Sequence, residues 1–241
     1  MSAASVFMLS LWMTTTGLHA TERGPSTLLS SAAQQTSGRQ QLPAFSKIQV
    51  AGDIHLNLFG GANQRTADVR CHTPDGPGVT FELDGKTLMV RPQHEDRRTS
   101  DTCLAVIHAS GVEGLEVAGT ATVRGGMLSE LTDARLAGSG SLDLRGLRAP
   151  RLALQAAGAG LVKLSGAVDT VTVEVSGAAD IQAKYLVAQH GTLKVTGSGS
   201  IEATTQASVN AQSAGSGTIT VHGQPPKVSQ NALGDGEIVI R

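Results

Sequence analysis

Aromatic residues are scarce in this sequence: among 241 residues there are four Phe, one Trp and one Tyr. Globular cores usually depend on large aromatic side chains, so a core of that kind is disfavoured. Glycine is abundant instead, with 29 residues. The composition therefore favours an interior of stacked aliphatic side chains between glycine turns. It also disfavours a carbohydrate-binding module that stacks sugars on aromatic rings.

The sequence has no strong excess of charge of either sign. Its formal net charge is −1, and its isoelectric point is about 6.6. Nucleic acids and anionic membrane surfaces attract proteins with a marked positive charge. Neither is therefore expected as a partner.

Long hydrophobic runs are also missing. The N-terminal apolar run, residues 6–13, is too short to cross a bilayer but has the length of a signal-peptide apolar region. The tripeptide Leu18-His19-Ala20 predicts cleavage after Ala20. We therefore expect residues 1–20 to be a signal peptide for export to the periplasm or cell surface. A buried N-terminal segment is the alternative.

The mature chain is expected to form one domain without a transmembrane segment. Residues 21–42 are rich in Ser, Thr, Gln and Gly, which predicts a flexible linker. From there the sequence is strand-like to its end, so the domain is predicted at 43–241. Within it, 79–83 and 86–90 are joined by Asp84-Gly85, a two-residue hairpin signal.

Cysteine is limited to Cys71 and Cys103, and each flanks a strand-like run. In an exported protein an isolated pair is most often a disulfide. It would close a loop of about 30 residues and stabilise the fold by roughly 3–4 kcal/mol. Two free buried thiols are the alternative.

A glycine-centred phrase recurs seven times in the second half of the chain, and its first glycines are 18 to 20 residues apart. Such a period is the signature of a solenoid. These glycines are predicted to be structural corners because each phrase stands where the chain must turn tightly. They are Gly119, Gly138, Gly158, Gly177, Gly197, Gly215 and Gly234.

Alternating positions around each phrase predict strands. The fourth residue after the first glycine is always aliphatic, and the third residue before it is always polar. A repeat of this length is too short for a strand-helix-strand crossover, which needs about 30 residues. We therefore predict an all-β fold, a right-handed parallel β-helix of seven regular coils with an irregular N-terminal cap. In its outer polar column, Glu116 would lie beside Arg135, and Glu174 beside Lys194.

The sequence offers little sign of catalysis or of a bound cofactor. The glycine phrases do not extend to nucleotide-binding motifs, and the seven histidines lack metal-ligand spacing. The charged run 93–98 is more simply a solvated loop than a metal site. The nearest approach to a catalytic cluster is Arg124, Asp143 and Lys163 on consecutive coils, for which a surface charge ladder is the simpler interpretation. We expect no cofactor and no metal.

Several segments together resemble a known bacterial family. They are residues 45–52 at the start of the domain, residues 84–90 farther along it, the Gly-Ser-Gly phrases at 138–140, 197–199 and 215–217, and the turn at 223–228. The chain is similar over 43–241 to the putative auto-transporter adhesin head domain of the GIN type, a domain of unknown function. The resemblance implies an exported protein with a β-helix similar to that of pectate lyases. It supplies no catalytic or ligand-binding residues to carry over.

The expected function is that of a non-enzymatic envelope or surface protein that serves in adhesion or as a scaffold. Its partner would be an envelope or extracellular polysaccharide or another protein. One alternative is a polysaccharide-acting enzyme that uses the cluster around Asp143. The other is a periplasmic module that pairs with a partner chain through its terminal strand, residues 237–241.

Overall fold

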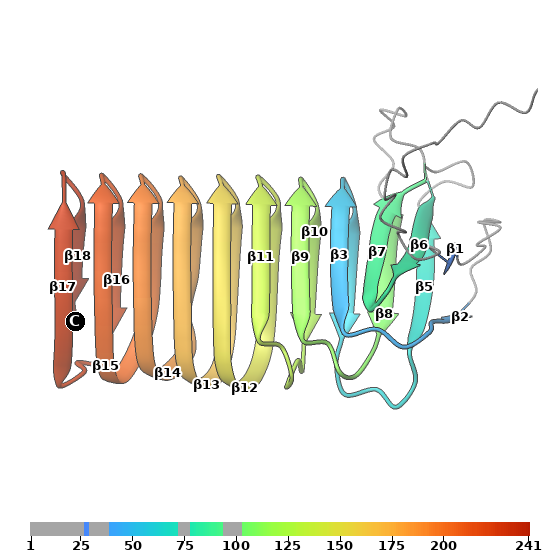
Figure 1. The fold of residues 1–241 in the computed structure, drawn as a ribbon, viewed down its shortest axis with the longest axis horizontal. Coiled ribbons are helices and arrows are strands. Elements are labelled where there is room, and N and C mark those ends of the chain that lie inside the picture. The colour runs from blue at the N-terminus through green and yellow to red at the C-terminus, as the bar shows by residue number, and fades with distance from the viewer. Residues whose placement is uncertain (1–26, 29–38, 72–77, 94–102) are drawn as a thin grey trace, which may run out of the picture.

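A computed structural model describes residues 27–28, 39–71, 78–93 and 103–241. The protein is a right-handed parallel β-helix whose coils stack side by side along one axis (Figure 1), as predicted. The predicted signal peptide and the charged run at 94–98 lie outside the described residues. None of the described residues belongs to a helix long and apolar enough to cross a membrane.

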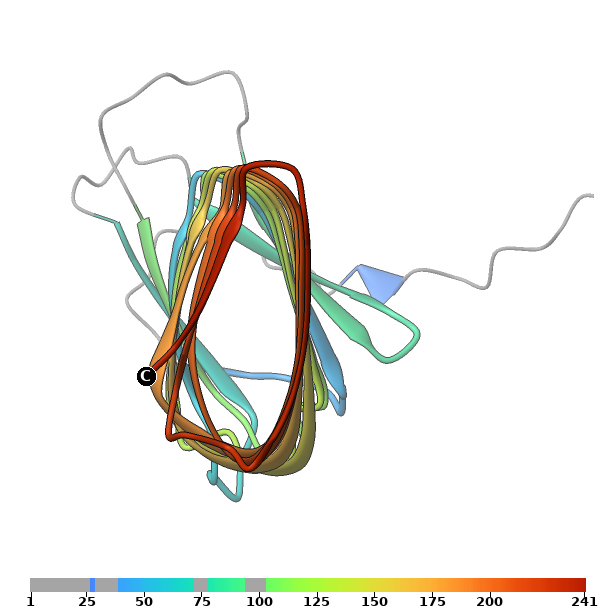
Figure 2. The ribbon, with the colours of Figure 1, turned by 90° about the vertical axis from the view of Figure 1, so that its left-hand side faces the viewer.

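Each regular coil has two long sides joined by two turns, and the stacked coils form a flattened oval in cross-section (Figure 2). The first side precedes the glycine corner and the second side follows it. The opposite turn, here called the return edge, leads from the second side to the first side of the next coil. β9 (Gly114–Gly119) and β10 (Thr122–Gly126) are the two sides of one such coil.

In β12 to β15 the strands run around the return edge without interruption (Figure 1). They are preceded by β11 (Asp133–Gly138) and followed by β16 (Thr218–His222), β17 (Lys227–Leu233) and β18 (Glu237–Ile240). The uninterrupted strands are β12 (Ser141–Gly158), β13 (Leu161–Gly177), β14 (Asp180–Gly197) and β15 (Ser200–Gly215). All pairings from β9 to β18 are parallel and join neighbouring coils.

The interior is a ladder of aliphatic side chains, as the alternation predicts. The column on the second side is buried in every coil but the last, where Ile238 is partly exposed. Its buried members are Val123, Leu142, Val162, Ile181, Ile201 and Ile219. Stacking in register removes these side chains from water, and burial of each contributes roughly 1.5–3 kcal/mol.

The N-terminal part begins with a regular coil, which differs from the predicted irregular start. β3 (Lys47–Gly52) pairs in parallel with β9, and β4 (His55–Phe59) pairs with β10. The next coil outward is made by β7 (Thr87–Pro92) on β3 and β8 (Cys103–His108) on β4. The spatial order of the coils therefore departs from the order along the chain, which hides this first coil from a search for constant spacing.

Antiparallel strands cap this end of the solenoid. β5 (Thr66–Cys71) pairs with β8, and β6 (Val79–Asp84) pairs with β7. The predicted hairpin is therefore present, but its two-residue turn is Gly85-Lys86 instead of Asp84-Gly85, since Asp84 still pairs with Thr87. Two short strands complete the cap: β1 (Thr27–Leu28) on β6 and β2 (Gln40–Gln41) on β5. Strand pairing therefore extends into the segment predicted as a linker.

Candidate functional site

The cluster singled out in the sequence lies on the second side of the solenoid. The register places Arg124 of β10 beside Asp143 of β12, and Asp143 beside Lys163 of β13. Residues paired in this way point to the same face of a sheet, here the outer one. The structure thus brings the three side chains together on three successive coils.

Asp143 is held by an arginine from its own strand. Arg145 donates two hydrogen bonds to its carboxylate, from Nε to Oδ1 at 3.0 Å and from Nη2 to Oδ2 at 2.7 Å. These hydrogen bonds lower the pKa of Asp143, and the charges of Arg145, Lys163 and Arg124 lower it further. The carboxylate stays ionised near neutral pH and is poorly suited to donate a proton. Sequence reasoning missed Arg145, although residues two apart on a strand share a face.

Further carboxylates on the second side are also engaged by neighbours. Glu202 accepts a hydrogen bond from His222 Nε2 at 2.7 Å, and its Oε1 lies 3.9 Å from Lys184 Nζ. Asp180 accepts hydrogen bonds from Gln182, at 2.8 Å, and from the Ser200 hydroxyl. These contacts form a satisfied polar surface across adjacent coils.

The outer column of the first side has the predicted neighbours, but these oppositely charged neighbours do not form ion pairs with each other. Glu116 is in register with Arg135, and Glu174 with Lys194. Within the described residues neither pair comes within 4.0 Å, and Arg135 binds Asp133 at 3.1 Å instead. A partner two residues away on the same strand is already aligned, so little side-chain freedom is lost in forming that pair.

The two cysteines are joined in the cap. Cys71 and Cys103 are direct cross-strand neighbours in the antiparallel pair β5–β8. Their sulfurs are bonded, and their Cα atoms are 4.1 Å apart. The disulfide links the strand that closes the solenoid to the outermost coil.

The seven corner glycines form one stack at the turn from the first side to the second. All seven have a positive φ, a conformation that L side chains rarely adopt. At Gly158, where φ is 113°, a Cβ would lie 2.4 Å from the carbonyl oxygen of Gly138 in the coil before. Both the backbone conformation and the close stacking therefore require glycine at this position.

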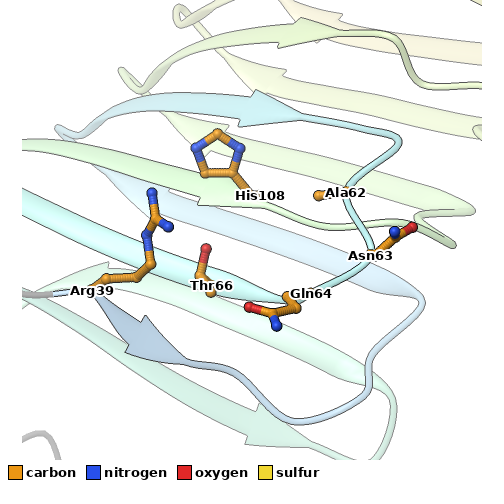
Figure 3. A pocket seen from close by; sticks show the side chains of 6 residues that line it. All are labelled: Arg39, Ala62, Asn63, Gln64, Thr66 and His108. Atoms are coloured by element: carbon orange, nitrogen blue, oxygen red, sulfur yellow. The ribbon is translucent and has the colours of Figure 1, made fainter.

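A shallow cavity of about 300 Å³ lies at the return edge of the cap (Figure 3). It is lined by Arg39, Ala62, Asn63, Gln64, Thr66 and His108. The imidazole of His108 stacks on the ring of Phe59, with centroids 5.1 Å apart. Sequence reasoning missed this site because its residues come from four separate places: the chain before β2, the loop between β4 and β5, β5 and β8. In the part of the chain that the structure describes, no three His, Cys, Asp or Glu side chains are placed to hold a metal.

The stacked glycine corners, aliphatic interior and polar outer ladders define the class of protein: a parallel β-helix with an antiparallel cap. Residues 44–225 match the family described as "Putative auto-transporter adhesin, head GIN domain". The protein belongs to this family, as the sequence resemblance predicted.

Solved structures share the fold at low sequence identity. A putative adhesin from Bacteroides fragilis NCTC 9343 is 21% identical with a TM-score of 0.77, and the match covers 85% of this chain and 95% of the other. A putative adhesin from Parabacteroides merdae ATCC 43184 is 19% identical with a TM-score of 0.62 and the same coverage. A putative lipid binding protein from Parabacteroides distasonis ATCC 8503 is 17% identical with a TM-score of 0.65, again over 85% and 95%. No curated protein matches the sequence.

Proposed function

We propose that this protein is a non-enzymatic, exported surface or envelope protein that binds an extracellular partner along the outer faces of its solenoid. The observation that carries the proposal is the second side, where outward polar and charged side chains follow one another over successive coils. Membership of an adhesin head-domain family supports the same reading. A long, flat and repetitive surface suits binding to an extended partner better than it suits the enclosure of a small substrate.

The chemistry around Asp143 argues against the enzyme alternative. A general acid needs a pKa near the working pH, whereas the pKa of Asp143 is lowered by Arg145 and its neighbours. Both oxygens of this carboxylate also accept hydrogen bonds from Arg145. A carboxylate held in this way serves better to fix cation positions than to transfer protons.

The pairing alternative rests on the last coil. Among the described residues β17 pairs only with β15, and β18 only with β16. Two apolar side chains of β17, Val228 and Leu233, are 44% and 63% exposed. Such an edge can accept a further strand.

One experiment separates these functions. The purified mature protein is screened on a glycan array and, in parallel, incubated with acidic and neutral polysaccharides to detect chain cleavage. We expect glycan or cell binding without turnover. Cleavage that disappears in Asp143→Ala would overturn the non-enzyme proposal. The absence of both binding and cleavage would favour strand pairing.

A further inference from the structure

The exposed large apolar side chains are concentrated at one edge of the solenoid. Five are present among the described residues, and two of them belong to the last coil. The other three lie at or next to the return edge: Phe59, Met127 and Tyr185 are 38%, 65% and 77% exposed. Only four aromatic residues are described, and the remaining two, Phe45 and Phe81, are buried. Both exposed aromatic rings among the described residues therefore lie along the same edge.

The strand register aligns these side chains. Phe59 is the neighbour of Gly126, and Gly126 is the neighbour of Arg145. Farther along, Ser165 of β13 is the neighbour of Tyr185. From β4 to β14 there are four steps between coils, or about 19 Å at the usual strand spacing. A Cβ at Gly126 would meet nothing within 4 Å, so the surface between Phe59 and Arg145 is open.

Irregularities in the strands coincide with this edge. The β12–β13 register shifts between Leu144 and Leu147, so Arg145 lies in a bulge. The β14–β15 register shifts between Ala183 and Val187, which leaves Tyr185 without a partner on β15. Bulges redirect side chains and are over-represented beside functional sites. Here each bulge carries an exposed side chain of the edge.

The charge between the two rings is positive. On the second side of the intervening coils, Arg124, Arg145 and Lys163 contribute three cations and Asp143 contributes one carboxylate, which gives a formal sum of +2 on that side. The return edge of the same coils also carries an exposed cation, Arg148, and two exposed carboxylates, Glu130 and Asp169. Asp143 is already bound to Arg145. Among the described residues, no carboxylate oxygen lies within 4.0 Å of the side-chain nitrogens of Arg124 or Lys163, so neither forms an ion pair, and both side chains are exposed. These two cations are free to meet an anionic ligand.

We propose that this return-edge strip binds one acidic polysaccharide chain laid parallel to the solenoid axis. The strip comprises Phe59, Arg124, Met127, Arg145, Lys163 and Tyr185. The exposed rings would pack against the apolar faces of sugar rings, and the cations would pair with carboxylate or sulfate groups between them. The inference rests on the proposed function and names its ligand class.

The shape and charge of the strip favour a polysaccharide over other anions. The strip is linear and spans several coils, which suits a polymer, whereas the cavity at His108 lies beyond Phe59 at its end. Nucleic acid binding normally draws on a strongly basic domain, and the net charge of this protein is −1. Competition by single-stranded DNA in the binding experiment tests whether the strip distinguishes an acidic polysaccharide from nucleic acid.

Binding of the purified mature protein is measured by affinity electrophoresis in gels that contain polygalacturonate, chondroitin sulfate or neutral dextran. We expect retardation by an acidic chain and none by dextran. The carboxylated and sulfated gels show which anionic group is preferred. Retardation by dextran equal to that by both acidic chains would overturn the inference, as would competition by single-stranded DNA at equal charge concentration.

Variants locate the binding. Each cation close to an anionic partner strengthens binding, so the double variant Arg124→Gln/Lys163→Gln is expected to weaken binding at least about tenfold. Tyr185→Ala is expected to weaken binding with the cations intact. The matched control Arg151→Gln/Lys194→Gln removes two exposed cations that lie outside the strip. Its binding is expected to stay within about twofold of the wild type, the level of most surface changes. Equal losses in the strip and control variants would show general charge attraction and refute the strip.

The two proposals fail in different ways. If the strip variants still bind neutral glycans or cells as the wild type does, the surface-protein proposal stands and the strip proposal is refuted. Cleavage of polysaccharide by the wild type would sink the surface-protein proposal itself. Each variant is compared with the wild type by circular dichroism and thermal unfolding, so that a loss of binding is read only from folded protein.

Discussion

The backbone of Gly52 lies in register with that of Gly119, although β4 to β8 separate the two glycines in the chain. The coil of β3 and β4 is therefore held between the coil of β7 and β8 and the coil of β9 and β10. The coil of β3 and β4 cannot separate without breaking strand pairs on both of its faces. The cap and the solenoid are thus built as one stacked unit.

Removal of the disulfide is expected to destabilise the cap. Cys71 and Cys103 are 32 residues apart, and closing such a loop stabilises a fold by roughly 3–4 kcal/mol in the chain-entropy model. The double variant Cys71→Ser/Cys103→Ser should lower the free energy of unfolding by about this amount in urea titration. Thiol counting of the exported protein under denaturing, non-reducing conditions is the companion measurement. Two reactive thiols would refute the bond.

Gly158→Val is expected to cost about 1–3 kcal/mol, because a β-branched side chain would have to adopt a positive φ. Its Cβ would also meet the Gly138 carbonyl oxygen in the coil before. Gly126→Val is the matched control, since that position has open space and no positive φ. Urea unfolding of both variants checks the corner. A neutral Gly158→Val would contradict the assignment.

The local repeat is what sequence reasoning recovers well. Aliphatic and polar columns and the glycine corners depend only on residues within one coil, so constant spacing exposes them. The first coil was missed, although Ala51-Gly52 followed by Leu56 has the same pattern as the later phrases. Its stacking on β9 is set by long-range pairing around an inserted cap, and no local pattern records which coil lies next to which.

The candidate site was predicted only in part, for a related reason. Coil spacing places Arg124, Asp143 and Lys163 together, and the structure does so. Coil spacing does not reveal that Arg145 binds Asp143, because the choice of partner depends on side-chain rotamers and on competing partners. The alignment of Phe59 with Tyr185 was likewise hidden, since it requires the position of the displaced first coil.

Export with cleavage after Ala20 is the expected fate of the N-terminus, because residues 6–13 form a short apolar run before an acceptable cleavage site. Intact mass spectrometry of protein recovered from the periplasm or cell surface should give a chain that begins at Thr21. Ala20→Pro is a useful variant, since it is expected to block cleavage and leave the precursor. A wild-type species that retains Met1, or that occurs only in cytosol, would contradict export.

Arg145→Gln is expected to raise the pKa of Asp143 toward the ordinary carboxyl range, because the two hydrogen bonds to the carboxylate are the largest cause of its lowering. Lys163 and Arg124 remain, so the return should be incomplete. Carbon-detected NMR titration of the carboxyl group measures the change. Arg148→Gln, which removes a nearby exposed arginine that does not contact Asp143, should leave the midpoint unchanged.

The same shift fixes the sign of a pH effect on stability. A carboxyl group whose pKa is lower in the folded state stabilises the fold above its unfolded-state pKa, and this contribution is lost as pH falls through the folded pKa. The stability difference between wild type and Arg145→Gln should therefore be largest near neutral pH and shrink under acid conditions. A difference that is constant across this range would mean that Arg145 acts through packing rather than through the charge of Asp143.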